Sequence, residues 1–193
     1  MQIILVALAL ASMLFAQKGS NHSSRIVAGI LAILWLWMGV VYHWLFFSSI
    51  NGAAIIFGAI FVLQAVLFLS AGVSGDELSF RFRPDLSGAT GILLMIYALV
   101  IYPVLGFVFG HKYPHSPTFG LPCPTVIFTF GLLLWTNKRV PLYILLIPFA
   151  WSLLGFSAAF LFGMFEDVGL VIAGFMAVSL LLWRRKMENR IAP

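Results

Sequence analysis

The feature of this chain that most restricts its fold is a series of long apolar stretches without a charged residue. Residues 26–47, 52–73 and 88–110 each hold more than 20 consecutive residues that include no Asp, Glu, Lys or Arg. A helix needs roughly 20 apolar residues to cross about 30 Å of hydrocarbon. Backbone amides in lipid must be hydrogen-bonded within their own segment, and the stretches show no strand-like alternation. They therefore predict transmembrane helices.

The composition excludes most soluble classes of protein. Hydrophobic residues make up 62% of the 193 residues and charged residues 9%, with a mean hydropathy of +1.07. A soluble domain carries about a quarter charged residues. A soluble enzyme and a nucleic-acid-binding domain are thus excluded, and so is an intrachain disulfide, because Cys123 is the single cysteine.

We predict one all-α domain over residues 1–193, a polytopic membrane bundle of seven transmembrane helices. The predicted spans are Met1–Gln17, Ile26–Phe47, Gly52–Val73, Gly88–Gly110, Phe119–Asn137, Val140–Phe165 and Val168–Trp183. The first span could be a signal peptide, but Lys18 and Arg25 follow its apolar run rather than precede it, which favours a retained helix. Pro103 and Pro148 lie inside spans and predict kinks.

The positive charges predict the orientation of the bundle. If seven spans alternate, Lys112 lies on one side, and the other ten basic residues share the opposite side: Lys18, Arg25, Arg81, Arg83, Lys138, Arg139, Arg184, Arg185, Lys186 and Arg190. Short loops rich in Lys and Arg stay in the cytoplasm. We therefore expect the N-terminus outside and the C-terminus inside, in a bacterial inner (cytoplasmic) membrane.

Many of the large aromatic residues fall toward the ends of the spans. Such residues are typical of the interfacial aromatic belt, and this interpretation covers Trp35, Trp37, Tyr42, Trp44, Tyr102, Trp135, Tyr143, Trp151 and Trp183. Gln64 is the only strongly polar residue deep in a span, where an amide more often bonds another helix than a substrate. Gly106 and Gly110 form a small-xxx-small step that is typical of close helix packing.

The predicted topology collects side chains able to bind a ligand near the outer face. His43, Trp44, Asn51 and Gln64 are the candidate substrate-binding residues, and the candidate metal ligands are His43, His111, His115, Cys123, Glu166 and Asp167. Nitrogen, sulfur and oxygen donors of this mixture suit copper or zinc. An ordinary polar surface at the headgroups is the alternative. Pro114 and Pro117 make a helix at His111 and His115 improbable, which weakens the metal interpretation.

Two prolines flank the cysteine in the segment from Phe119 to Thr125. Such a segment predicts a break in regular helix that frees carbonyl oxygens beside a cavity. A rigid turn that starts a helix is the other interpretation, and it is the favoured one. The segment resembles locally the intramembrane motif of heavy-metal pumping ATPases, although this chain has no room for their other domains.

Three classes of function remain open. Transport or channelling of a small solute or metal ion fits the proline-disturbed helices and the outer donors. A non-catalytic subunit or assembly factor of a larger membrane complex, or a homo-oligomer, fits the small-residue faces. An enzyme or haem carrier is the third, but no catalytic motif is present and His43 is the one histidine within a span. The expected partners are the lipid bilayer and other membrane subunits, with no nucleic acid.

The stretch from Trp37 to Gln64, the Tyr102-Pro103 turn and the segment from Phe119 to Thr125 together resemble an uncharacterised family of bacterial multi-pass membrane proteins, known only as a domain of unknown function. The resemblance covers nearly the whole chain. It implies that the His43-Trp44 end, the Asn51 turn and the proline-flanked segment belong to one pattern, and that an amphipathic segment precedes the first span in relatives. It implies no activity.

Overall fold

The polypeptide folds into helical segments that follow the predicted apolar stretches closely. The computed structural model describes residues 1–111, 116–161 and 163–191. The helices in these ranges are α1 (Gln2–Lys18), α2 (Asn21–Trp37) with the π-helical η1 (Met38–Phe46) and the 3-10 turn η2 (Phe47–Ser49), α3 (Ala54–Phe68) with the π-helical η3 (Leu69–Ser74), α4 (Leu86–Ile96) with the π-helical η4 (Tyr97–Ile101) and α5 (Tyr102–Val108), α6 (Pro122–Leu134), α7 (Leu142–Leu161), and the 3-10 turn η5 (Phe165–Asp167) with α8 (Val168–Ile191). The all-helical prediction is confirmed.

Four of these helices are long and apolar enough to cross a membrane. They cover Asn21–Ser49, Ala54–Ser74, Leu86–Val108 and Phe165–Arg190. Three apolar helices are shorter, at Gln2–Lys18, Pro122–Leu134 and Leu142–Ser157. The chain thus has the features of a membrane protein.

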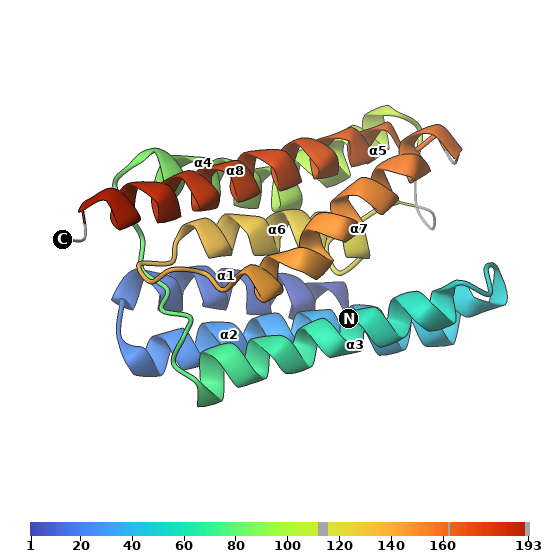
Figure 1. Ribbon diagram of the computed structural model, residues 1–193. Helices are drawn as coiled ribbons and strands as arrows, with labels where there is room; N and C mark the ends of the chain where they lie inside the picture. The colour runs from blue at the N-terminus through green and yellow to red at the C-terminus, as the bar shows by residue number, and fades with distance from the viewer. Residues whose placement is uncertain (112–115, 162, 192–193) are drawn as a thin grey trace.

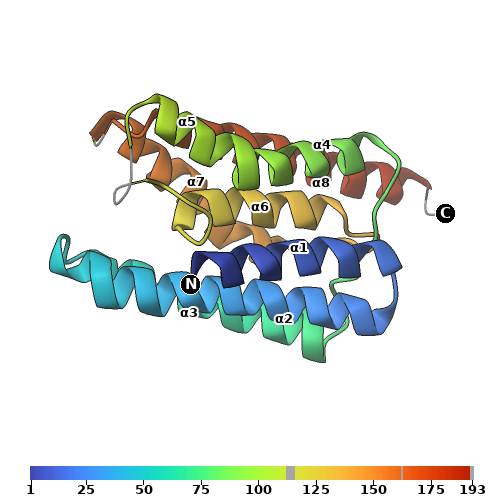
Figure 2. The same ribbon diagram turned by 180° about the vertical axis from the view of Figure 1, so that it is seen from behind.

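The helices lie side by side along one long axis, so that their connections collect at two ends (Figures 1 and 2). One end carries the α1–α2 turn, the segment between α3 and α4, and the last turn of α8; we call it the basic end. The opposite end carries the α2–α3 hairpin turn near Asn51 and η5; we call it the Glu166 end. Lys112 lies outside the described residues.

Helix α6 is the centre of the bundle. Every residue of α6 except Cys123 is buried, and α4, α7, α8 and η4 pack around it (Figures 1 and 2). Its 13 residues extend about 20 Å, which is shorter than the hydrocarbon thickness. A short helix is compatible with membrane depth here because protein rather than lipid surrounds its ends.

Two pairs of glycines bring helix backbones into contact. A Cβ on Gly91 of α4 would lie 2.7 Å from the carbonyl oxygen of Gly131 in α6, and Gly39 and Gly58 approach each other similarly between η1 and α3. Gly106, predicted to pack against a helix, instead has Pro117 within 2.5 Å of its Cβ position. The close helix packing is therefore formed by other glycines than the predicted step.

The basic end is closed by the segment between η3 and α4. Leu78 and Phe80 are buried there, and the Phe80 amide donates to Oγ of Ser24 at 3.0 Å. The Arg81 amide donates to the Trp135 carbonyl at 2.6 Å. This segment therefore ties α2 to the end of α6.

Two helices extend beyond the predicted spans, because polar residues continue them. Helix α2 begins at Asn21 rather than at Ile26, since Ser20 and Ser23 form a capping box that pairs the first free amides. Helix α8 continues past Trp183 to Ile191. Apolar length alone does not detect either extension.

The two internal prolines have different surroundings. Pro103 follows η4 directly, and Tyr102 donates its amide to the Tyr97 carbonyl, five residues earlier. Because Pro103 has no amide hydrogen, the regular ladder is interrupted here, and the π-helical turn accommodates the interruption. Pro148 lies within the continuous helix α7.

Candidate functional site

Two adjacent carboxylates are buried at the Glu166 end. Glu166 and Asp167 belong to the turn η5, which runs directly into α8. Their side chains are 0% and 2% exposed. The positive end of the α8 dipole favours negative charge at this position, but burial of two neighbouring acids still requires partners.

The helix formed by α4, η4 and α5 supplies two of these partners. The Tyr102 hydroxyl donates to Oδ1 of Asp167 at 2.5 Å, and the Tyr97 hydroxyl donates to the Glu166 backbone carbonyl at 2.9 Å. A Cβ on Gly169 would lie 2.2 Å from the Tyr97 oxygen. Glycine at this position therefore allows Tyr97 to reach η5.

The Glu166 carboxylate is only half paired. Its Oε1 lies 3.1 Å from Nδ1 of His111, whose side chain is 24% exposed. Its Oε2 has no hydrogen-bond partner among the described residues. The partly exposed His111 thus connects the surface to the fully buried Glu166 carboxylate. One oxygen of this carboxylate has no partner in the described part of the chain.

Cys123 adds a sulfur atom to this group. It lies in the first turn of α6, is not in a disulfide, and interacts with the side chains of Asp167, Tyr102 and Trp151. We call these residues the Glu166 cluster: Tyr97, Tyr102, His111, Cys123, Glu166 and Asp167. Four separate segments of the chain contribute to it.

The proline-flanked segment is not a broken helix. Pro122 and Pro124 both lie in the first turn of α6, where amides have no intrahelical acceptor and proline costs nothing. The favoured interpretation, a rigid start of a helix, is therefore correct for Pro122 to Thr125, and the other, a break in regular helix, is wrong. The consequence for the site is that Cys123 has a fixed position at the buried end of α6.

His43 is fully buried in an aromatic environment. Both its ring nitrogens lack a hydrogen-bond partner among the described residues. Its ring centroid lies 4.8 Å from that of Phe61 and 5.3 Å from that of Trp151. Tyr42 and Phe57 also face the imidazole. His43 belongs to the π-helical η1, a conformation that often occurs at functional sites.

Trp151 of α7 lies between His43 and the Glu166 cluster. Its indole packs edge-on against the imidazole of His43. A Cβ on Gly155, one turn further along, would lie 3.4 Å from Nε1 of Trp151 and 3.6 Å from Sγ of Cys123. The indole therefore packs against His43, and its Nε1 and Sγ of Cys123 both border the same Gly155 position.

The other candidate residues take structural positions. Gln64 is fully buried and donates from Nε2 to the Ile144 carbonyl of α7 at 3.2 Å, as expected for an amide between helices. Trp44 donates from Nε1 to the Ile55 carbonyl, and Oδ1 of Asn51 accepts from the Ala53 amide. Trp44 and Asn51 thus stabilise the hairpin between η1 and α3.

The predicted metal ligands fall into separate groups. His111 meets Glu166, Cys123 meets Asp167, and His43 stands behind Trp151. Within the described ranges, no group of three or more His, Cys, Asp and Glu side chains is arranged to hold a metal ion. His115 lies outside the described residues. A complete ligand shell for copper or zinc therefore stays a prediction.

Three residues of this region were not predicted to belong to it. Tyr97 was not singled out, and Tyr102 and Trp151 were assigned to the aromatic belt. Tyr102 is 1% exposed, so the belt assignment is wrong for it. It is also wrong for Trp35 and Trp135, which are 0% and 2% exposed and donate to Thr129 and to the Gly88 carbonyl. In the sequence, only the adjacent acids Glu166 and Asp167 between apolar stretches indicated that a polar site lies here.

The charges at the basic end are arranged differently from those at the Glu166 end. Arg25 pairs with Asp76 at 3.1 Å, and the hydrogen bond from this guanidinium lowers the pKa of the Asp76 carboxyl. Partial burial raises the pKa of Asp85, but the Gly88 amide and Arg83 outweigh burial, so that this pKa is lowered as well. These acids are exposed partners of arginines.

Comparison with known proteins gives one match. A family model described as "Family of unknown function (DUF6064)" matches residues 1–192. No curated protein and no solved structure matches the chain.

Proposed function

The chain belongs to this family of unknown function, and we propose from its own residues that it is a multi-pass transporter or channel for a small cation, with its binding site at the Glu166 cluster. The observation that carries the proposal is the half-paired Glu166 carboxylate, which is fully buried while its Oε2 has no partner among the described residues. Ionisable groups inside membrane bundles mark ion and substrate pathways.

The donors of the Glu166 cluster favour a cation. The cluster contains two carboxylates, an imidazole, a thiol and two phenols, which meet in pairs rather than in one ligand shell among the described residues. The described part of this end carries no Lys or Arg. Carboxylate, imidazole and thiolate ligands suit zinc or copper. The His111 side chain is partly exposed and contacts the buried Glu166 carboxylate. It would therefore be the first group that an entering ion meets.

The interior beyond the cluster supports a route into the bundle. Trp151 packs against His43, and His43 packs against Phe61, which lies one turn before Gln64 in α3. His43 keeps both ring nitrogens, and Gln64 keeps Oε1, without partners among the described residues. Such unpaired polar atoms are rare in a protein interior. They offer successive binding groups for a cation whose contacts change as it moves.

Flux measurements test this proposal directly. Purified protein in proteoliposomes should take up Zn²⁺ or Cu⁺, and Glu166→Gln should lower the initial rate at least tenfold, since the replacement removes the charge and keeps the shape. Glu188→Gln at the basic end is the matched control and should keep the rate within about twofold. Absence of flux of either ion, or equal rates for both variants, would contradict the proposal.

The proposed topology has seven spans, an outer N-terminus and a cytoplasmic C-terminus in a bacterial inner membrane. The excess of basic residues at one end of the bundle supports this orientation. An alkaline-phosphatase fusion after Arg190 should be inactive and one after His115 should be active. The opposite pattern would reverse the two faces.

A subunit of a larger membrane complex is the second candidate function. The hairpin of η1, η2 and α3 extends beyond α1 and α6 at the Glu166 end (Figure 1). Its surface is strongly apolar, with Leu45 67%, Phe46 65% and Ile50 79% exposed. Another membrane subunit would fit this hairpin. Stable co-purification of a partner from native membranes, together with no flux by the isolated protein, would favour this function.

A further inference from the structure

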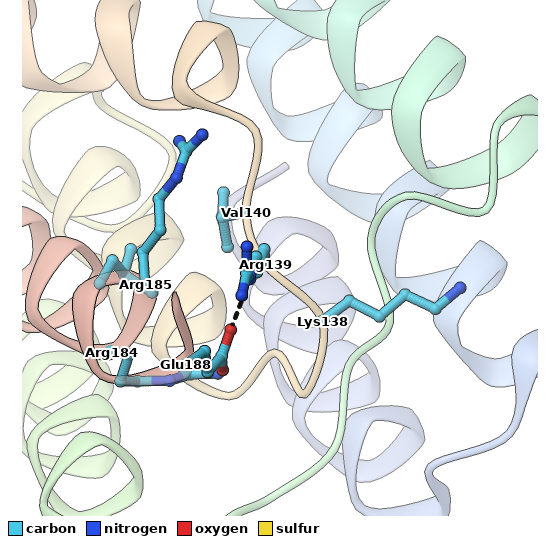
Figure 3. Close-up of a pocket in the computed structure, with 7 residues that line it drawn as sticks. Lys138, Arg139, Val140, Arg184, Arg185 and Glu188 are labelled. Carbon is cyan, nitrogen blue, oxygen red and sulfur yellow. Dashed lines mark hydrogen bonds and ion pairs between the residues drawn. The ribbon is translucent and has the colours of Figure 1, made fainter. Parts of the chain in front are cut away.

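A shallow cleft at the basic end joins the Lys138–Val140 segment to the last turns of α8 (Figure 3). Four of its lining residues are cationic and one is acidic: Lys138, Arg139, Arg184, Arg185 and Glu188. Val140 and Leu181 complete the lining and are 7% and 8% exposed. The cleft therefore combines positive charge with an apolar floor.

Most charges around this cleft already have partners. Arg139 pairs with Glu188 at 2.8 Å, and Lys138 donates to the Asp76 carbonyl. Arg185 is exposed and forms no hydrogen bond or ion pair with any residue that the structure describes. The basic end as a whole has ten basic and four acidic residues. Its acids thus leave an excess of positive charge.

Arg184 fixes the inner wall of the cleft. Its side chain is almost fully buried and donates to the Thr136 carbonyl at 2.8 Å and to the Leu134 carbonyl at 3.5 Å. Its Nε is buried without a partner among the described residues. Arg184 therefore holds positive charge at the inner wall of the cleft, although its Nε is enclosed and does not face the mouth.

The position of the cleft along α8 is equally specific. Trp183, which is 55% exposed, comes directly before Arg184, so the cleft begins where the apolar part of the helix ends. Tryptophan at such a boundary is typical of the headgroup level of a bilayer. A ligand in the cleft would therefore reach both lipid headgroups and the edge of the hydrocarbon.

We propose that this cleft binds the phosphate group of an anionic phospholipid. Arginine binds phosphate oxygens through several donors at once, and basic clefts between transmembrane helices are suited to anionic headgroups. The glycerol and the start of an acyl chain would lie against the apolar part of α8 that ends at the exposed Trp183.

Opening of the Arg139–Glu188 pair would make room for this ligand. The enclosed volume of the cleft is about 10 Å³, so the phosphate lies across its mouth rather than inside it. The two paired side chains are 46% and 38% exposed, and such surface pairs contribute little net stability. A phosphate therefore replaces Glu188 as the partner of Arg139 while Arg185 closes from the other side.

The test uses the full-length protein in a neutral detergent. Phosphatidylglycerol added to the micelles should raise the thermal unfolding midpoint by about 4 °C or more, since a ligand that binds the folded state stabilises it. Phosphatidylcholine and inorganic phosphate are the comparison additions, and each should shift the midpoint by less than about 1 °C. An equal shift with inorganic phosphate would overturn the assignment to a lipid.

Matched variants separate this cleft from general attraction of charges. Arg139→Gln with Arg185→Gln should weaken phosphatidylglycerol binding at least tenfold. Lys186→Gln with Arg190→Gln also removes two positive charges, here from the last turns of α8 outside the cleft. This double variant should change binding by less than about twofold. Arg185→Gln alone, which removes no described contact, should weaken binding about threefold or more. Equal losses in both double variants, or no loss in Arg185→Gln, would overturn the proposal.

Discussion

The hydroxyl of Tyr102 donates a 2.5 Å hydrogen bond to Oδ1 of Asp167, which is 65 residues away in the chain. The bond connects the start of α5 to the turn before α8, and both side chains are buried. It is thus a link between two apolar helices made by polar groups alone.

Tyr102→Phe should lower the free energy of unfolding by about 2 kcal/mol, because the buried, ionisable carboxyl of Asp167 loses the phenol that donates to it. Chemical unfolding in detergent, followed by circular dichroism, measures the difference. Tyr143→Phe is the control, since the Tyr143 hydroxyl bonds Glu77 on the surface and should contribute less than about 0.5 kcal/mol. Equal effects of the two changes would contradict a special role for Tyr102.

His43→Leu should leave stability unchanged or raise it by about 1 kcal/mol, because it removes two buried ring nitrogens that have no described partner. Phe61→Leu removes buried ring atoms without removing a polar group and should cost about 1 kcal/mol. Thermal unfolding of both variants measures the contrast. If His43→Leu were the more destabilising change, the imidazole would have a structural role instead of the proposed role in the pathway.

Arg184→Met should destabilise the bundle by about 2 kcal/mol, since the Thr136 and Leu134 carbonyls at the end of α6 lose their charged donor. Arg185→Met, one residue further along and exposed, should change stability by less than about 0.5 kcal/mol. The comparison is made by the midpoint of chemical unfolding. A larger effect of Arg185→Met would contradict the assignment of Arg184 as the cap of α6.

The lowered pKa of Asp85 predicts that the stability of the folded protein depends on pH. Its side chain caps α4 by accepting from the Gly88 amide, and its pKa is lower in the folded protein than in the unfolded chain. The stabilisation by its charge is therefore complete above the unfolded value of about 3.9 and is lost as pH falls through the lower folded value.

Asp85→Asn keeps the capping oxygen and removes the charge, so it isolates this contribution. The wild-type protein should unfold at a higher temperature than Asp85→Asn between about pH 5 and pH 7, and the difference should shrink as pH falls below about 4. Asp85→Ala should lose the cap as well and cost about 1 kcal/mol more. If the difference in unfolding temperature between the wild-type protein and Asp85→Asn grew as the pH fell, the predicted effect of the Asp85 charge would be contradicted.

The sequence predicted the helices and their grouping at two ends because those depend on apolar length and charge, which are local properties. It did not predict that α6 is central, since a uniformly apolar segment does not show which of its sides faces lipid. Tyr102 and Trp35 were misassigned for the same reason: an aromatic residue in an apolar run is compatible with either a membrane interface or a buried position. The extension of α2 to Asn21 depends on the capping box of Ser20 and Ser23. Hydropathy does not detect such hydrogen bonds.

The meeting of Glu166 and Asp167 with Cys123 depended on tertiary packing. Topology correctly suggested that these residues share one end of the bundle. The positions of Trp151, between His43 and Cys123, and of Tyr97, over Gly169, follow from side-chain packing between helices distant in sequence. No spacing in the chain encodes such contacts.

The enclosure of α6 has a consequence for how the protein is made. Its neighbour α4 precedes it in the chain, but α7 and α8 are synthesised after it, and Arg184 of α8 donates to the Leu134 carbonyl at its end. A nascent chain that ends before α8 therefore carries a short, incompletely covered helix. Enclosure of α6 therefore depends on helices made after it, and it is complete only once α8 has been synthesised and has packed against α6.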